Sequence, residues 1–473
     1  MLFSSIVFLF YFLPIVLVTY YLLRKSYRLK NIFLLVASLF FYAWGEPWFV
    51  LIMILSIMLN YIFALIIDKY RDKKSIARLI LILTCVTNLG ILFVFKYLGF
   101  TIRTINEMAR LNLSIPNIIL PIGISFFTFQ AMSYVIDVYR EDGKVQKNPL
   151  YVALYISFFP QLIAGPIVRY STIADQMDNR KETWQKISIG TCRFITGLGK
   201  KVLIANNMAI IADRIFQMNT DAGVVASLAW LGSIAYTLQI FFDFSGYSDM
   251  AIGLGLMFGF KFEENFNYPY ISKSVTEFWR RWHISLGTWF KDYVYFPLGG
   301  SRVSNKDKII RNLFVVWMLT GIWHGAEWTF ILWGLSNFVF ISMEKFFGID
   351  RMEKHKILRN IYTLFIINLN WVIFRSKNLI EARKFILNMF GVLGNGFWSD
   401  YTLMFLKEYS LFLIGGIIFS IPLAKRINKF IVEGRRGSIL LEVGYPFVVI
   451  TLFLICVSYL TKGTYNPFIY FNF

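Results

Sequence analysis

Long apolar runs separated by short polar loops dominate the chain. They occur near 3–23, 31–45, 48–67, 79–98, 118–138, 149–165, 226–260, 311–346, 358–374, 409–424 and 444–461. A helix needs about 20 apolar residues to cross a bilayer, so most of these runs match one crossing and the longest have room for two. The pattern predicts an all-α, polytopic integral membrane protein with about 11–13 membrane helices.

Two central segments, 171–225 and 261–310, are more polar but remain rich in aromatic residues. We expect interfacial or re-entrant helices there. Irregular backbone at membrane depth is tolerated only where protein or a water-filled cavity surrounds it, so these segments also predict a central cavity. Because no internal repeat or low-complexity linker interrupts the chain, we expect one membrane domain over residues 1–473.

Composition supports the membrane assignment and removes other classes of protein. Of the 473 residues 57% are apolar and 16% are charged, which excludes a water-soluble enzyme or a disordered scaffold. The 48 Lys and Arg against 28 Asp and Glu give a net charge of +20. In a membrane protein this excess indicates cytoplasmic loops and contact with anionic lipid, and not nucleic acid. The three cysteines are widely spaced and predict no disulfide framework.

The basic residues also predict an orientation. They concentrate after the first, third and fifth runs, as in the loop that contains Arg24, Lys25, Arg28 and Lys30. The positive-inside rule then places these loops in the cytoplasm and the N-terminus outside it. Residues 2–23 lack the basic start and the cleavage site of a signal peptide, so we expect a retained first span.

His324 is the first candidate for chemistry. It is the twelfth residue of the apolar stretch 313–333, whose only other ionisable residue is Glu327, so a continuous helix would place it near the bilayer midplane. An ionisable group at that depth usually faces a cavity or a partner. Gly321 and Gly325 have the spacing that lets a second helix approach. An imidazole suits general acid–base catalysis, and a neutral imidazole that bridges two helices is the structural alternative.

His283 is the second candidate. On a helix it would share one face with Trp279 and Trp282. Such a face is typical of an interfacial helix with a tryptophan belt, and it is equally compatible with a histidine that faces a substrate.

Arg280 and Arg281 also allow a structural and a functional interpretation. They are either snorkelling cations at the interface, or a cationic collar that binds the phosphates of an anionic substrate. Glu277 stands four residues before Arg281, which predicts an ion pair on one helix.

Asp243 and Asp249 lie in an otherwise apolar region. We expect a structural role in which nearby hydroxyls, such as those of Ser245 and Ser248, donate to the carboxylates. No cluster of His, Asp and Glu has the spacing of metal ligands, so no metal site is predicted.

Two motifs carry a resemblance to a known family. The sequences WRRWHISL (279–286) and TGIWHGAEWTF (320–330) resemble the signature of the membrane-bound O-acyltransferase (MBOAT) family, in its alginate O-acetyltransferase-like branch. Further matches are MLFSS at the start, LPIGISFFTF from Leu120, FFPQLIAGPIVR from Phe158, DFSGYSD from Asp243 and NPFIY from Asn466. The resemblance therefore covers nearly the whole chain.

The resemblance implies a tunnel in which His324 and His283 are the catalytic histidines. It divides the domain into N-terminal helices at 1–170, a catalytic core at 171–346 and C-terminal helices at 347–473. It implies acetyl-CoA as co-substrate with no bound cofactor, and a bacterial cytoplasmic membrane location. The donor-binding candidates are Arg280, Arg281, Trp279 and Trp282.

On the other side of the membrane, the resemblance implies a glycan acceptor or an extracytoplasmic acetyltransferase or esterase-like partner. Many relatives carry His-Gly where this chain has Ser336 and Asn337. The selectivity of those relatives for donor or acceptor is therefore a weaker guide to the selectivity of this chain. Two alternatives remain: D-alanyl transfer to teichoic acid, and a transporter of lipid or glycan that uses His324 for proton coupling.

Overall fold

The computed structural model describes residues 1–23, 26–163, 165–303, 305–348, 354–423, 435–463, 465–466 and 468–469. Throughout these residues the regular structure is helical and no strand is present, which confirms the all-α prediction. Seven helical stretches among them are long and apolar enough to cross a membrane: Phe49–Lys69, Lys74–Ala109, Trp184–Thr220, Trp328–Phe347, Lys356–Arg375, Asp400–Phe419 and Gly444–Thr461. The predicted total of about 11–13 membrane helices stays a prediction.

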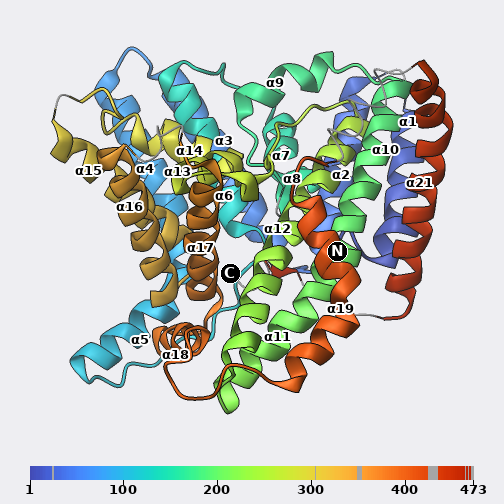
Figure 1. The fold of residues 1–473 in the computed structure, drawn as a ribbon. Coiled ribbons are helices and arrows are strands. Elements are labelled where there is room, and N and C mark those ends of the chain that lie inside the picture. Colours follow the sequence, from blue (N-terminus) through green and yellow to red (C-terminus); the bar gives the residue numbers. More distant parts are fainter. Residues whose placement is uncertain are drawn as a thin grey trace. The chain divides into compact units, whose positions relative to one another are not determined.

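The chain forms two compact units, one of residues 1–194 with 250–263 and the other of residues 195–249 with 264–473. The boundaries fall inside helices α10 (Trp184–Gly199) and α12 (Ala226–Met257). The other elements of the first unit are η1 (Phe8–Phe12), α1 (Leu13–Leu22), α2 (Tyr27–Ala43), α3 (Phe49–Lys69), α4 (Lys74–Leu92), η2 (Phe93–Tyr97), α5 (Leu98–Ala109), α6 (Ile124–Arg140), α7 (Pro149–Ser157), α8 (Phe159–Leu162) and α9 (Tyr170–Asn179) (Figure 1).

Apolar packing and a polar pair hold the first unit together. The phenyl rings of Phe8, Phe41 and Phe159 form a buried cluster with centroids 5.5–6.3 Å apart. Between α3 and α4 the amides of Asn60 and Asn88 bond each other reciprocally at 3.0 and 2.9 Å. Such amide pairs satisfy polar groups that lipid cannot solvate.

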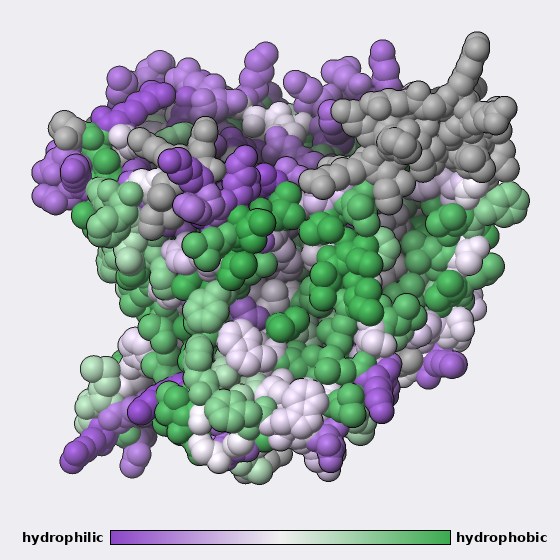
Figure 2. Space-filling view, in the orientation of Figure 1, coloured by the Kyte–Doolittle hydropathy of each residue, from purple (hydrophilic) through white to green (hydrophobic). Residues whose placement is uncertain are grey.

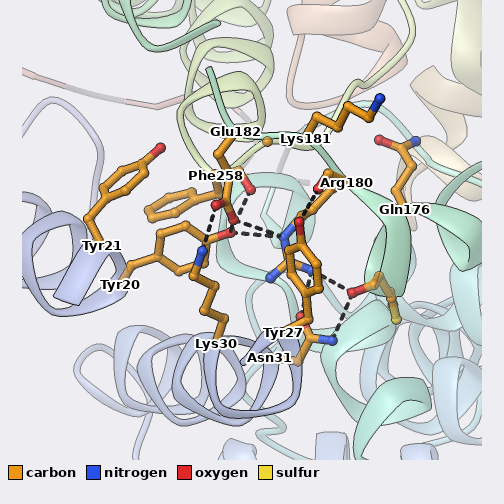
Figure 3. A network of polar contacts seen from close by, with 12 residues as sticks. Tyr20, Tyr21, Tyr27, Lys30, Asn31, Gln176, Arg180, Lys181, Glu182 and Phe258 are labelled. Atoms are coloured by element: carbon orange, nitrogen blue, oxygen red, sulfur yellow. Dashed lines mark hydrogen bonds and ion pairs between the residues drawn. The ribbon is translucent and has the colours of Figure 1, made fainter. Parts of the chain in front are cut away.

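The first unit also buries an ionic network (Figure 3). Lys30 Nζ lies 2.5 Å from a carboxylate oxygen of Glu182, and the other oxygen of Glu182 accepts from the Tyr20 hydroxyl at 2.5 Å. The guanidinium of Arg180 donates to Tyr20 and Asn31 at 2.8 and 2.7 Å. The side chains of Lys30 and Arg180 are 2% and 0% exposed, so their charges depend on these partners.

This network corrects one part of the loop-charge prediction. Lys30, counted there as a loop cation, is buried and paired with Glu182. Arg24 and Lys25, from the same loop, lie outside the described residues. The N-terminal orientation stays a prediction.

The second unit contains η3 (Lys200–Ala205), α11 (Asn206–Asp221), η4 (Pro269–Ile271), α13 (Val275–Arg281), α14 (Ile284–Phe290), η5 (Lys291–Tyr295), α15 (Lys306–His324), α16 (Trp328–Phe347), α17 (Lys356–Arg375), α18 (Leu379–Met389), α19 (Asp400–Phe419) and α21 (Arg435–Thr461). Helix α16 packs between α15 and α17, and α13 contacts both α16 and α17. In Figure 2 the surface over α19 is largely hydrophobic, and Leu411, Ile414 and Ile417 are exposed there. We interpret this surface as facing lipid.

The prediction for residues 171–225 is wrong for most of that segment. Residues 184–220 form one helical stretch through α10, η3 and α11, apolar enough to cross a membrane. Its lysines mislead a composition-based prediction because they are partnered: Lys200 bonds Asp249 and Lys201 bonds Asp243, each at 2.6 Å. Residues 261–310 contain short helices, and their interfacial or re-entrant placement stays a prediction.

Candidate active site

His324 is the last residue of α15, and this corrects the prediction of one continuous helix over 313–333. The backbone is extended at Gly325, and α16 begins at Trp328, so α15 and α16 form a hairpin. Gly321 and Gly334 let the two helices touch, because their Cα atoms would approach within about 3.3 Å of any added Cβ. The close-approach prediction is thus confirmed for Gly321, with Gly334 as its partner.

Aromatic rings surround the imidazole of His324. Its centroid lies 4.9 Å from those of Trp323 and Trp333 and 5.3 Å from that of Phe374. His324 itself is 5% exposed. The rings meet the imidazole at 77–81°, in the edge-to-face arrangement that aromatic pairs favour. These contacts fix the orientation of the imidazole.

His283 lies between two short helices, and the predicted single helical face is wrong. Helix α13 ends at Arg281, Trp282 is extended, and His283 has φ 46° and ψ 53°. A left-handed backbone is uncommon for a residue with a side chain and is maintained here by the surroundings. Trp323 links the two histidines, since its ring lies 6.1 Å from His283 and 4.9 Å from His324.

Asn265 holds the turn at His283. Its side-chain oxygen lies 3.1 Å from His283 Nδ1 and accepts from the Ser285 hydroxyl at 2.9 Å, while its carbonyl accepts from the Ile284 amide at 3.0 Å. An amide oxygen is an acceptor, which assigns the proton to Nδ1 and leaves Nε2 as the basic nitrogen. Burial lowers the pKa of His283 to about 3, so the ring is neutral near pH 7. Sequence reasoning missed Asn265, because nothing local links positions 18 residues apart.

A chain of polar contacts positions Trp279. Its indole N–H donates to the Asn337 side-chain oxygen at 2.9 Å, and Asn370 donates to the same oxygen at 3.3 Å. Ser336 in turn donates to Asn370 at 2.7 Å. Ser336 and Asn337, which depart from the family pattern, therefore support a tryptophan of the WRRWHISL motif.

The two arginines of the motif have different surroundings. Arg281 Nη2 pairs with Glu277 at 2.9 Å, which confirms the predicted ion pair. Arg280 is exposed and lines a cavity. Helix α13, which carries both, is held by the buried carboxylate of Glu344, which accepts from the amides of Val275 and Thr276 at 2.6 and 2.8 Å.

The first cavity, of about 370 Å³, lies beside α13 and α14. Its lining brings together four predicted residues, Trp279, Arg280, Trp282 and His283, with Lys291, which was not predicted. Thr320, one turn before His324, also lines it. The first cavity is thus aromatic with two basic side chains, Arg280 and Lys291.

The second cavity, of about 510 Å³, lies among α11, α12, α17 and α18. Phe330 and Phe374 line it, and the Phe374 ring also packs on His324. Asp213 and Arg375, which bond each other, face this cavity together with Glu327. Phe374 thus connects His324 to the second cavity, and Trp333, which contacts His324, packs on Trp279 of the first cavity.

Asp243 and Asp249 have structural partners in the described residues. Lys201 and the Ile469 amide bond Asp243 at 2.6 and 2.8 Å, and Lys200 bonds Asp249. The hydroxyls of Ser245 and Ser248 make no hydrogen bond within the described part of the chain, so they are not the donors we expected. Pro467 and Tyr470 of the C-terminal motif lie outside the described residues.

The chain is similar to known proteins over most of its length. The family model described as MBOAT, membrane-bound O-acyltransferase family, matches residues 36–380. The probable alginate O-acetylase AlgI of Pseudomonas putida is 40% identical, with both chains covered completely. The peptidoglycan O-acetyltransferase of Helicobacter pylori is 39% identical over 83% of this chain and 80% of its own.

A more distant relative shares less of the chain. The teichoic acid D-alanyltransferase of Bacillus subtilis is 33% identical over 49% of this chain and 60% of its own. The family model spans both histidine motifs, and the O-acetyltransferase similarity extends over most or all of the chain. The chain is thus a multi-pass membrane O-acyltransferase and belongs to the membrane-bound O-acyltransferase family.

Proposed function

We propose that this enzyme transfers an acetyl group from acetyl-CoA to an extracytoplasmic hydroxyl, for O-acetylation of a cell-surface or exported polysaccharide. One observation carries the proposal: two rings that contact His324 connect it to cavities of different chemistry, Phe374 because it lines the second cavity and Trp333 because it packs on a residue of the first. Trp279, in the first cavity, packs on Trp333, and Phe374 lines the second. A donor and an acceptor can therefore occupy separate cavities, each connected to His324 through packed aromatic rings.

The reaction requires a general base from the enzyme, and it does not require the enzyme to make the thioester more electrophilic. A thioester is already activated, so the enzyme must orient an alcohol and remove its proton. His324 acts as general base, a role that contributes about 10²–10⁴-fold to the rate. The rings around it exclude water that would hydrolyse the thioester, and they fix the imidazole in one orientation.

The first cavity suits the donor. Arg280 and Lys291 provide the cations that phosphate groups of CoA require, and Trp279 and Trp282 provide apolar surface for its arm. His283 lines the same cavity as a neutral ring and orients the donor there. No bound cofactor is needed for this reaction.

The second cavity suits an alcohol, since its lining combines aromatic rings with polar side chains. We place the first cavity on the cytoplasmic side of a bacterial cytoplasmic membrane, where acetyl-CoA is made, and the second toward the exterior. From the basic loops we also propose that the N-terminus is extracytoplasmic. The acceptor is a glycan, or an acetyltransferase or esterase-like partner that passes the group on.

Loss of the imidazole tests the proposal. Purified protein in lipid nanodiscs should cleave the acetyl-CoA thioester in the presence of acceptor, and His324→Ala should lower the rate by about 10²–10⁴-fold. His355→Ala, at an exposed histidine, is the matched control. Full activity in the His324 variant would refute the assignment, and a proton-coupled transporter would show no thioester cleavage at all. D-alanyl-carrier protein, offered in place of acetyl-CoA, tests the D-alanyl alternative.

A further inference from the structure

We propose that Asn337 is a positioning residue for the acyl donor. It holds the indole of Trp279 in one orientation, and that indole lines the first cavity. The same indole packs on Trp333, which contacts His324. The inference rests on the proposed function, because it takes the first cavity as the donor site.

The side-chain amide of Asn337 joins three helices. Its oxygen accepts from the Trp279 indole N–H of α13 at 2.9 Å and from the Asn370 amide of α17 at 3.3 Å. Its nitrogen donates to the Trp333 carbonyl of α16, its own helix, at 2.9 Å. Because an amide nitrogen cannot accept, an amide turned over would set a donor against both Trp279 and Asn370. The orientation of the Asn337 amide is therefore fixed.

Ser336 extends this network from the preceding position on α16. Its hydroxyl donates to the Asn370 oxygen at 2.7 Å, and the Asn370 nitrogen in turn donates to Asn337. Asn337 and Asn370 are both buried, and each amide both donates and accepts. A buried network in which the amides are satisfied specifies one arrangement of its members.

Packing alone would not fix the indole of Trp279. Its ring meets those of Trp317 and Trp333 edge to face, with centroids 5.0 and 5.3 Å apart. Contacts of this kind are available to an indole in either of its two flipped orientations. Only one orientation directs the N–H toward Asn337, and the other would leave a donor without its acceptor in a crowded site. The hydrogen bond therefore selects the orientation.

The orientation of Trp279 matters to the donor. Arg280 and Lys291 suit the phosphates of CoA, whereas Trp279 offers apolar surface to the arm that carries the thioester. A displacement of about 1 Å from the productive geometry can cost about 10²-fold in rate. Since Asn337 is fully buried, it acts on the donor through Trp279.

Binding of acetyl-CoA without turnover tests the inference. Asn337→Leu keeps a side chain of similar shape but removes the acceptor oxygen, so the indole must be reordered when the donor binds. We expect the dissociation constant of acetyl-CoA, measured by isothermal titration calorimetry with protein in nanodiscs, to rise about tenfold. The nucleotide fragment of CoA, phosphoadenosine diphosphate, lacks the arm, and its affinity should stay unchanged. A general loss of structure would weaken both ligands.

A double-mutant cycle tests whether Asn337 acts through Trp279. Trp279→Phe removes the N–H donor and keeps an aromatic ring. In that background Asn337→Leu should change the affinity for acetyl-CoA by less than about twofold, because the hydrogen bond is already absent. Asn337→Asp, a neutral acid when buried, keeps an oxygen at the acceptor position and should bind acetyl-CoA within about threefold of the parent. Asn117→Leu, at an exposed asparagine, is the control.

Ser336→Ala tests the same network from its other end, should Asn337→Leu fail to fold. It removes the donor to the Asn370 oxygen, so the dissociation constant of acetyl-CoA should rise about twofold to fivefold. The affinity for the nucleotide fragment should again stay unchanged.

Three outcomes would overturn the inference. These are unaltered affinity for acetyl-CoA in the folded variants, equal weakening of both ligands, and independent effects of Asn337→Leu and Trp279→Phe in the cycle. Failure here is distinguishable from failure of the proposed function, because a parent protein that binds no acetyl-CoA would refute the proposed donor itself. Binding by the parent with unaltered affinity in the variants would refute the positioning role alone.

Discussion

Two regions of this enzyme bury ionisable side chains in opposite ways. In the first unit, Lys30 and Arg180 are held by Glu182 and by neutral oxygen atoms around them (Figure 3). In the second unit, His283 and His324 are packed against aromatic rings. Permanent charges cannot be buried without paired partners, whereas an imidazole can be buried neutral. The ionic network therefore maintains structure, and the histidine site keeps groups that can exchange a proton.

The largest effect on stability is expected in the ionic network. Lys30→Met removes the nearer of the two cations that pair with the Glu182 carboxylate and should lower the free energy of unfolding by about 3–5 kcal/mol. Denaturant unfolding in detergent micelles measures this change.

Two further variants sharpen that test. Lys69→Met, at an exposed lysine, should change stability by less than about 0.5 kcal/mol. Lys30→Met combined with Glu182→Leu should recover only part of the loss, because the buried guanidinium of Arg180 then lacks its carboxylate. A Lys30 variant as stable as the parent would show that the network does not maintain structure.

At the histidine site we expect a smaller cost in stability and a loss of activity. Asn265→Ala removes the acceptor of His283 Nδ1 and of the Ser285 hydroxyl, so it should cost about 1–3 kcal/mol of stability. The turnover number should fall more than the Michaelis constant for acetyl-CoA rises, since the imidazole loses its orientation. Asn267→Ala, at an exposed asparagine two residues on, is the control. If the kinetic constants of Asn265→Ala were unchanged, Asn265 would not position the His283 imidazole for the reaction.

Acid should destabilise the protein through His283. Burial lowers the pKa of this ring to about 3, whereas the unfolded chain has the ordinary value near 6.5. Between these values the unfolded state binds a proton that the folded state does not, so stability falls as the pH drops below about 6.5, by about 1.4 kcal/mol per pH unit for one group. His283→Gln should make the stability profile flatter over that interval, as measured by unfolding at a series of pH values. A profile identical to that of the parent would contradict this account.

The smallest effect separates the two arginines of the motif. Arg280 is exposed in the first cavity, so Arg280→Gln should raise the Michaelis constant for acetyl-CoA about threefold to tenfold. Arg281→Gln should raise it less, because the guanidinium of Arg281 is paired with Glu277. Equal effects of the two variants on initial-rate kinetics would mean that the pairing does not distinguish them.

Sequence patterns predicted the local features of the site but not its long-range contacts. The spacing of Glu277 and Arg281 on one helix predicted their ion pair, and the small residue at Gly321 predicted a close helix approach. The contacts of Asn265, Asn337 and Phe374 were missed, because each meets its histidine or tryptophan from a distant part of the chain.

Composition gave wrong predictions of membrane spans where charged side chains are paired with opposite charges. The lysines of η3 made residues 184–220 too polar for a predicted span, but Asp243 and Asp249 neutralise them from α12. Likewise the apolar stretch 313–333 suggested one helix, although the chain turns at Gly325 and returns as α16. A hydropathy pattern records what each residue is, and not which side chain it meets.

The amino-acid sequence by itself determined that the chain is helical and lies in a membrane, because lipid leaves the backbone few ways to satisfy its hydrogen bonds. It also determined which two histidines carry the family's motifs. Tertiary structure decided that both imidazoles meet at Trp323, that Asn265 sets the tautomer of one, and that Phe374 connects the other to the second cavity. Those relations depend on packing between helices far apart in the chain, where burial and geometry are set jointly.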